Sequence, residues 1–82
     1  MLNQEYKVIT LNVNGLQNPI KRNKLISKMK REKQHIIFWQ ETHLCDKEHE
    51  KLKLLGFKNT YYSSYKRGRT RGVAILISNR TF

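Results

Sequence analysis

The sequence has little of what would tie it to the secretory route or to a membrane. Cys45 is its only cysteine, so no disulfide can form within the 82-residue chain. Its first residues, MLNQEYK, lack the apolar core of a signal peptide. Its longest apolar runs, HIIFW and GVAILIS, are far shorter than the roughly 20 residues that a membrane-spanning helix needs. We therefore predict an intracellular protein of a reducing compartment, neither secreted nor inserted in a membrane.

Acidic residues are also scarce. Asp and Glu number 6 against 17 Lys and Arg, which gives a formal net charge of +11 and a pI of about 10.2. Such an excess predicts a polyanionic partner, with nucleic acid first and an anionic membrane surface second. The composition is also typical of ribosomal-type proteins or of a merely soluble basic protein, and it says nothing about the fold.

The chain is predicted to form one small α/β domain, because it shows no repeat, linker or low-complexity segment. Asn18 is suited to the N-cap of an amphipathic helix and Pro19 to its first position. A second helix is predicted to start at Asp46 and to close at Gly56. Stretches rich in β-branched, aromatic and other apolar residues predict four strands, at residues 6–13, 35–41, 57–65 and 73–78.

Two of these elements also carry predictions about the core. Ile20, Leu25, Ile26 and Met29 are predicted to share the buried face of the first helix, whose other sides are basic. Trp39 lies in an apolar strand and is interpreted as a core residue rather than a platform for stacking bases.

The first strand, the first helix and the second strand form a βαβ unit, in which the two strands run parallel as neighbours. Asn12 ends the first strand and Glu41 the second, so both are expected at the same edge of the sheet, where ligands of α/β folds collect. Amide and carboxylate oxygens are hard donors of the kind that Mg²⁺ takes. An asparagine at a strand end also favours a turn, and a glutamate there is commonly solvated, so the spacing alone leaves these alternatives open.

Four blocks, LNVNGL, IKRNKL, FWQETHL and GVAILIS, occur in this order along the chain. Together they resemble the N-terminal part of the endonuclease/exonuclease/phosphatase superfamily. They are most similar to the endonuclease domain of LINE-type retrotransposon proteins, relatives of exonuclease III and the apurinic/apyrimidinic endonucleases. The resemblance runs from about Tyr6 to Arg80. It implies that residues 1–82 are an N-terminal fragment of such a domain, with an α/β (α+β) fold that is the incomplete half of a four-layered, DNase I-like sandwich.

The resemblance implies a site built on three residues. Asn12 and Glu41 match catalytic positions of the family, with Glu41 as the metal-binding glutamate and Asn12 beside the metal and the scissile phosphate. Asn14 stands where relatives carry Asp or Asn near the same metal. The implied cofactor is Mg²⁺, which Mn²⁺ can replace, and the implied reaction is hydrolysis of DNA phosphodiester bonds. His43 is interpreted as a surface or rim residue rather than a ligand, and His49 gives still less indication of a role.

The resemblance also implies that this enzyme is incomplete. The family domain is more than twice this length, and its later motifs supply a histidine paired with an acidic residue, further Asp and Asn residues and a tyrosine. HIIFW and VAILI are apolar on both faces, so both faces of the sheet are expected to be covered, although only two helices are predicted. We expect no DNA cleavage by the 82 residues alone. The implied partners are DNA, the missing C-terminal half and, as a further candidate, a reverse transcriptase in the same polyprotein, and the implied location is the nucleus.

A second motif points to nucleic acid without reference to catalysis. KRGRTRG, residues 66–72, follows a tyrosine-rich strand, and its cations suit phosphate groups. The candidate phosphate-binding residues are Lys66, Arg67, Arg69 and Arg71. A solvated hairpin tip would have the same composition. Two functions therefore remain open, a fragment of a Mg²⁺-dependent DNA phosphodiesterase and a non-catalytic basic nucleic-acid-binding module.

Overall fold

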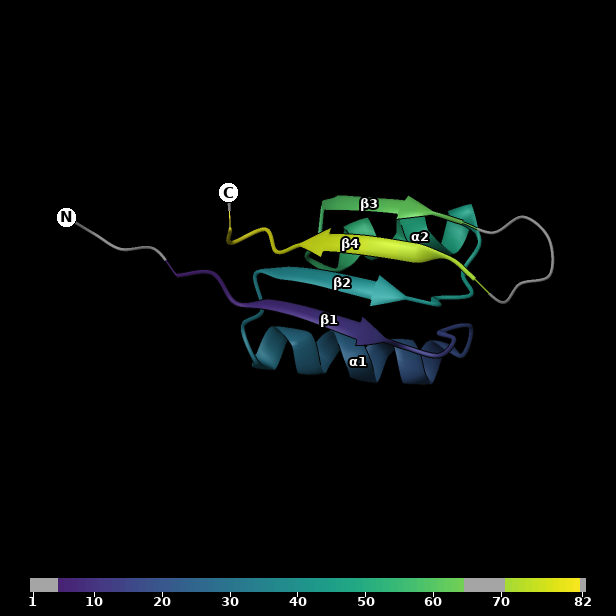
Figure 1. Ribbon diagram of the computed structural model, residues 1–82, viewed down its shortest axis with the longest axis horizontal. Coiled ribbons are helices and arrows are strands. Elements are labelled where there is room, and N and C mark those ends of the chain that lie inside the picture. Colours follow the sequence, from purple (N-terminus) through teal and green to yellow (C-terminus); the bar gives the residue numbers. More distant parts are fainter. Residues whose placement is uncertain (1–4, 65–70, 82) are drawn as a thin grey trace.

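A computed structural model describes residues 5–64 and 71–81 of the chain. It is a small mixed α+β domain with a four-stranded sheet and two helices (Figure 1). In chain order the elements are β1 (Val8–Asn12), α1 (Pro19–Arg31), β2 (Ile36–Gln40), α2 (Asp46–Leu52), the 3₁₀ turn η1 (Lys53–Leu55), β3 (Asn59–Ser63) and β4 (Val73–Ile77). The predicted order of strands and helices is confirmed, and each strand end lies within two residues of its predicted position.

The sheet is mixed, and its strand order is β1-β2-β4-β3. β1 and β2 are parallel neighbours, with Asn12 opposite Gln40. β4 is antiparallel to both β2 and β3. The predicted parallel pairing of β1 and β2 is therefore confirmed. β1 and β3 are therefore the edge strands of the sheet, and each has backbone groups on its outer side that pair with no other strand of the described residues.

The helix ends follow from local chemistry. The side chain of Asn18 accepts a hydrogen bond from the backbone nitrogen of Ile20 at 2.8 Å, and Pro19 is the first helical residue. α2 begins at Asp46 as predicted, but its last turn tightens into η1 before Gly56 ends it with a φ of 104°. Among the described residues, neither helix is long and apolar enough to cross a membrane.

Both helices pack against one face of the sheet and enclose the core. The buried apolar residues are Val13, Leu16, Ile26, Met29, Ile37, Trp39, Leu44, Leu52, Phe57, Ala74 and Leu76. Trp39 is a core residue, as expected. The prediction for Ile20 is wrong, because its side chain is 66% exposed. Arg22 takes the inward position of that turn instead, and its Nη1 donates to the carbonyl of Leu16 at 3.0 Å.

The opposite face of the sheet carries exposed apolar side chains. Val8, Phe38, Tyr61 and Val73 are all at least 37% exposed, and the strand register places them on the face turned away from the buried Trp39. Within the described residues, this face therefore lacks the cover that its apolar strands predict, as expected from the presence of only two helices. The reason is topological, since α1 and α2 lie on the same side of the sheet (Figure 1).

Candidate functional site

Asn12 and Glu41 meet at one edge of the sheet, where the parallel strands β1 and β2 both end. The Nδ2 atom of Asn12 donates a hydrogen bond of 2.6 Å to Oε2 of Glu41. Both residues are exposed, so the pair faces solvent. The βαβ geometry thus brings together the two side chains that the sequence placed at the same edge.

Asn12 has a second bond that fixes its orientation. Its Oδ1 atom accepts from the backbone nitrogen of Asn14 at 3.0 Å, which is the turn chemistry expected of an asparagine at a strand end. The side-chain amide is therefore shared between the turn and the carboxylate of Glu41. Lys21 adds a positive charge to this turn, because its Nζ donates to the carbonyl oxygens of Val13 at 3.0 Å and of Asn14 at 3.3 Å.

The backbone is strained where it passes this edge. Asn14, Glu41 and His43 have φ values of 53°, 53° and 57°, in the left-handed region that residues other than glycine rarely adopt. Lys33, the other described non-glycine residue with a positive φ, follows the end of α1, where that conformation is common. Such residues require support from their surroundings and cluster at functional sites.

The support comes from Thr42, which lies between two of the strained residues and is fully buried. Its backbone nitrogen donates to the carbonyl of Gly72 at 3.0 Å, and its carbonyl accepts from the nitrogen of Leu16 at 2.8 Å. Its hydroxyl is hydrogen-bonded to Nε2 of His49 at 2.9 Å. Three separate segments of the chain therefore hold the residue that follows Glu41.

His49, for which the sequence indicated no role, is the centre of this network. Its Nδ1 is hydrogen-bonded to the hydroxyl of Ser64 at 2.8 Å, and its ring is stacked on that of Tyr62 with a centroid distance of 4.7 Å. Burial lowers the pKa of His49, although the charge of nearby Asp46 opposes the shift. The imidazole is thus held in its neutral form, with both nitrogens paired to hydroxyl groups.

His43 lies beside the candidate site. Its Nε2 atom is 3.9 Å from Oε1 of Glu41, and it is buried without a hydrogen bond to the described residues. The ring packs on Gly15, where an added Cβ would approach its Nδ1 to 2.8 Å. This half-buried place at the edge of the sheet agrees with its interpretation as a rim residue.

The residues predicted to bind nucleic acid are only partly visible. Lys66, Arg67 and Arg69 lie outside the described residues. Arg71 is described and exposed, and its carbonyl accepts from the backbone nitrogen of His43 at 2.9 Å. The segment that leads into β4 therefore runs directly beside the loop that carries Glu41.

The donor atoms at this edge fit a divalent cation only in part. Glu41 offers a carboxylate, whereas the amide oxygen of Asn12 is engaged by the turn. Within residues 5–64 and 71–81, no group of three or more His, Cys, Asp or Glu side chains is arranged to hold a metal ion. Of the three residues predicted to bind the metal, only Glu41 offers a carboxylate, while Asn12 is hydrogen-bonded both to that carboxylate and to the backbone of Asn14.

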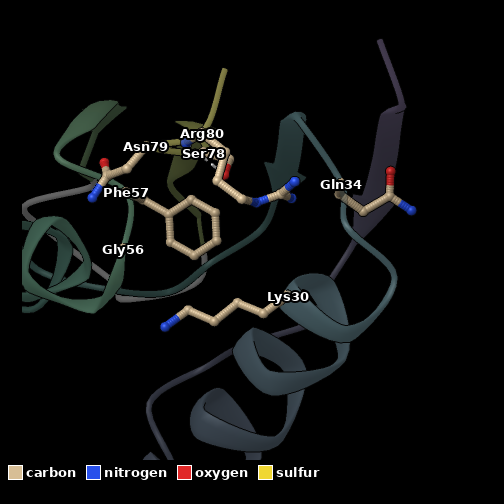
Figure 2. Close-up of a pocket in the computed structure, with 7 residues that line it drawn as sticks. All are labelled: Lys30, Gln34, Gly56, Phe57, Ser78, Asn79 and Arg80. Atoms are coloured by element: carbon tan, nitrogen blue, oxygen red, sulfur yellow. Dashed lines mark hydrogen bonds between the residues drawn. The ribbon is translucent and has the colours of Figure 1, made fainter. Parts of the chain in front are cut away.

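A separate cavity of about 260 Å³ lies at the opposite end of the sheet (Figure 2). Lys30 crosses it from α1, Phe57 forms part of its wall, and Arg80 enters it from the segment after β4. None of the described residues that line this cavity carries a carboxylate. It is therefore distinct from the edge where Asn12 and Glu41 meet.

No protein-family model matches this chain.

Proposed function

We propose that this chain is the N-terminal part of a Mg²⁺-dependent DNA phosphodiesterase of the endonuclease/exonuclease/phosphatase superfamily, of the LINE retrotransposon type, with a DNase I-like fold. The observation that carries the proposal is the pair formed by Asn12 and Glu41, two exposed polar side chains bonded at 2.6 Å at the carboxyl ends of parallel strands. The left-handed backbone at Glu41 supports it further, because such strain is retained where a function requires it.

Each side chain has a definite task in this proposal. Glu41 would hold the cation through its carboxylate, and Asn12 orients that carboxylate by donating a hydrogen bond to it. The cation, when bound, stabilises the negative charge that develops on the phosphodiester. Lys21 donates to the carbonyl oxygens of residues 13 and 14, so it adds positive charge to the turn that follows Asn12.

The uncovered face of the sheet supports the idea of a missing half. Its exposed apolar residues include Val8, Phe38 and Tyr61, on a sheet whose other face is packed by both helices. Contiguous exposed apolar surface of this kind marks a place where further polypeptide packs. In the proposal a second sheet from the same domain covers this face and brings the remaining catalytic groups to the edge that carries Glu41.

The 82 residues alone are proposed to be inactive. A single carboxylate holds Mg²⁺ weakly, because this cation retains several waters and relies on substrate phosphates. Among the described residues, no aspartate and no further glutamate side chain contacts Asn12 or Glu41. No second carboxylate of these residues is therefore placed to take a proton from the attacking water. Positioning and proton transfer each contribute orders of magnitude in rate.

The non-catalytic alternative is favoured by one observation, the net charge of +11. A basic module that binds nucleic acid would need neither Glu41 nor a metal. The two functions are therefore separated by testing whether Glu41 binds a divalent cation.

The test uses Mn²⁺ as a paramagnetic probe in NMR spectra of the chain. We expect Mn²⁺ to broaden the backbone amide signals of residues 12–15 and 41–43 selectively, and Glu41→Gln to abolish this effect. The matched control is Glu32→Gln, which removes a carboxylate at the other end of the sheet and should leave the broadening unchanged. Equal broadening in the wild type and in Glu41→Gln would refute the metal site and favour the non-catalytic module.

Activity is measured separately, by nicking of supercoiled plasmid with Mg²⁺. The 82-residue chain is expected to give no more nicking than its Glu41→Gln variant. In a chain extended by the second half of the domain, Glu41→Gln and Asn12→Ala should each reduce nicking strongly. If the 82-residue chain nicks DNA and Glu41→Gln abolishes this activity, the proposal that catalysis needs groups from a second half of the domain is wrong.

A further inference from the structure

The edge strand β1 and helix α1 enclose a groove that continues from the candidate site. This groove has a volume of about 360 Å³, and it is lined by Leu11, Asn12, Val13, Lys21, Lys24, Leu25 and Lys28. Asn12 is thus shared between the groove and the edge that carries Glu41. Among the described residues, no strand lies on the outer side of β1, so the groove is open there.

Three lysines of α1 lie along this groove at a spacing that suits a chain of phosphates. Lys21, Lys24 and Lys28 are exposed and follow one another at intervals of three and four residues, which places them on one side of the helix. A helix rises about 1.5 Å per residue, so the row is roughly 10 Å long. One strand of B-DNA advances about 3.4 Å per nucleotide, so the row spans about three nucleotides.

In the part of the chain that the structure describes, no carboxylate forms an ion pair with the lysines of this groove. α1 contains no acidic residue. Within the described residues, its one ion pair joins Arg22 to Glu48 at 3.7 Å, on the buried side of the helix. Leu11 and Leu25 supply an apolar floor, against which the stems of the lysines can lie while their ammonium groups reach outward.

We propose that this groove binds the phosphate backbone of a nucleic-acid strand, with Lys24 and Lys28 as its principal contacts. The strand would run along α1 and reach the candidate site at Asn12. This inference rests on the proposed function for the direction of the strand, but it does not depend on metal binding or cleavage. It adds a binding surface to the cations of residues 66–71, which lie in a different segment of the chain.

The test compares two variants of equal net charge. Lys24→Gln with Lys28→Gln removes both groove contacts and keeps Lys21, which is bonded to the turn at residues 13 and 14. Lys47→Gln with Lys58→Gln removes two exposed lysines on the β3 side of the sheet and serves as the control. Affinity for a labelled DNA duplex is measured at several salt concentrations, and circular dichroism checks that both variants remain folded.

We expect the groove variant to bind more weakly, with a slope of log affinity against log salt that is smaller in magnitude by about 1.8, since each duplex phosphate contact contributes about 0.9. The control variant should retain the wild-type slope. Equal slopes in the two variants, or binding to vesicles of anionic phospholipid with no binding to DNA, would overturn the proposal.

The outcomes separate this inference from the proposed function. A slope that depends on Lys24 and Lys28, together with Mn²⁺ broadening that ignores Glu41, would support the groove and refute the phosphodiesterase. If Mn²⁺ broadening depends on Glu41 but the groove variant keeps the wild-type salt slope, the metal site of the proposed phosphodiesterase is supported and the groove is refuted.

Discussion

Replacing His49 by phenylalanine should destabilise the domain while leaving its shape almost unchanged. Phenylalanine can keep the stacking on Tyr62, which has a centroid distance of 4.7 Å, but it cannot bond the hydroxyls of Thr42 and Ser64. Thr42 is fully buried, so its hydroxyl would lose its partner without gaining water. Ser64 is only half-buried, and its hydroxyl can turn to solvent.

The expected loss follows from these contacts. Each hydrogen bond contributes about 0.5–1.5 kcal/mol, and a buried hydroxyl left unpaired costs about 1–3 kcal/mol. We therefore expect His49→Phe to lower the free energy of unfolding by about 2–3 kcal/mol. For a domain of this size, that loss corresponds to a decrease in Tm of about 10–20 °C.

The assay is urea denaturation followed by circular dichroism at pH 7, with the double variant Thr42→Val, His49→Phe as its control. The double variant removes the unpaired hydroxyl, so it should recover about 1 kcal/mol relative to His49→Phe alone. A His49→Phe variant within about 0.5 kcal/mol of the wild type would refute the structural role of the network, since surface changes have effects of that size.

The same variant gives a prediction for pH. Burial lowers the pKa of His49 in the folded chain below its unfolded value of about 6.5. The neutral ring therefore stabilises the fold above about pH 6.5, and this contribution is lost as the pH falls through the folded pKa. The stability difference between wild type and His49→Phe should shrink between pH 7 and pH 5. Asp46 and the other titrating groups are present in both proteins, so a constant difference would contradict the assignment.

Three further predictions concern single contacts. Gly15→Ala should lower the free energy of unfolding, measured by urea denaturation, by more than about 1 kcal/mol. The φ of residue 15 is 88°, and the added Cβ would lie 2.8 Å from the His43 ring. An unchanged free energy of unfolding would count against this packing. Arg22→Met should destabilise the domain by about 1–3 kcal/mol in thermal denaturation, because the carbonyl of Leu16 loses the hydrogen bond from the Arg22 guanidinium. An unchanged Tm would show that this hydrogen bond is dispensable. The Glu50 carboxylate raises the pKa of Tyr62 to about 12, so Glu50→Gln should move that pKa towards 10 in an ultraviolet absorbance titration, and an unmoved titration would exclude the contact.

The meeting of Asn12 and Glu41 could be predicted because each step depends on local pattern and on a general rule. Apolar runs give the two strands, Asn18 and Pro19 give the helix between them, and a crossover of this length makes the strands parallel neighbours. The residues that end two such strands then share an edge. The exposure of Ile20 could not be read in the same way, because the helical pattern allowed more than one inward direction, and the long side chain of Arg22 found a carbonyl partner on the buried side.

The burial of His49 could not be predicted from the sequence, for a different reason. Its partners Thr42, Tyr62 and Ser64 come from a loop, a strand and the residue just after it, at separations of 7–15 residues. No periodicity connects these positions, and a histidine on a short helix full of charged residues has the same sequence pattern whether it is buried or exposed. Only the packing of α2 beneath β3 and β4 decides that this ring lies inside (Figure 1).

The orientation of Glu41 depends on contacts that reach beyond the strand it follows. The backbone of residues 41–43 pairs on one side with the 13–17 loop, where Gly15 donates to the carbonyl of Glu41 at 2.8 Å, and on the other with residues 71 and 72. These backbone hydrogen bonds on both sides support the left-handed conformation of Glu41, which would cost of order 1 kcal/mol or more without support. Strand assignment alone therefore gives the position of this carboxylate but not its direction. Its direction is determined jointly by the turn that contains Asn12 and by the segment entering β4. A substitution in either segment should therefore change the orientation of the Glu41 carboxylate.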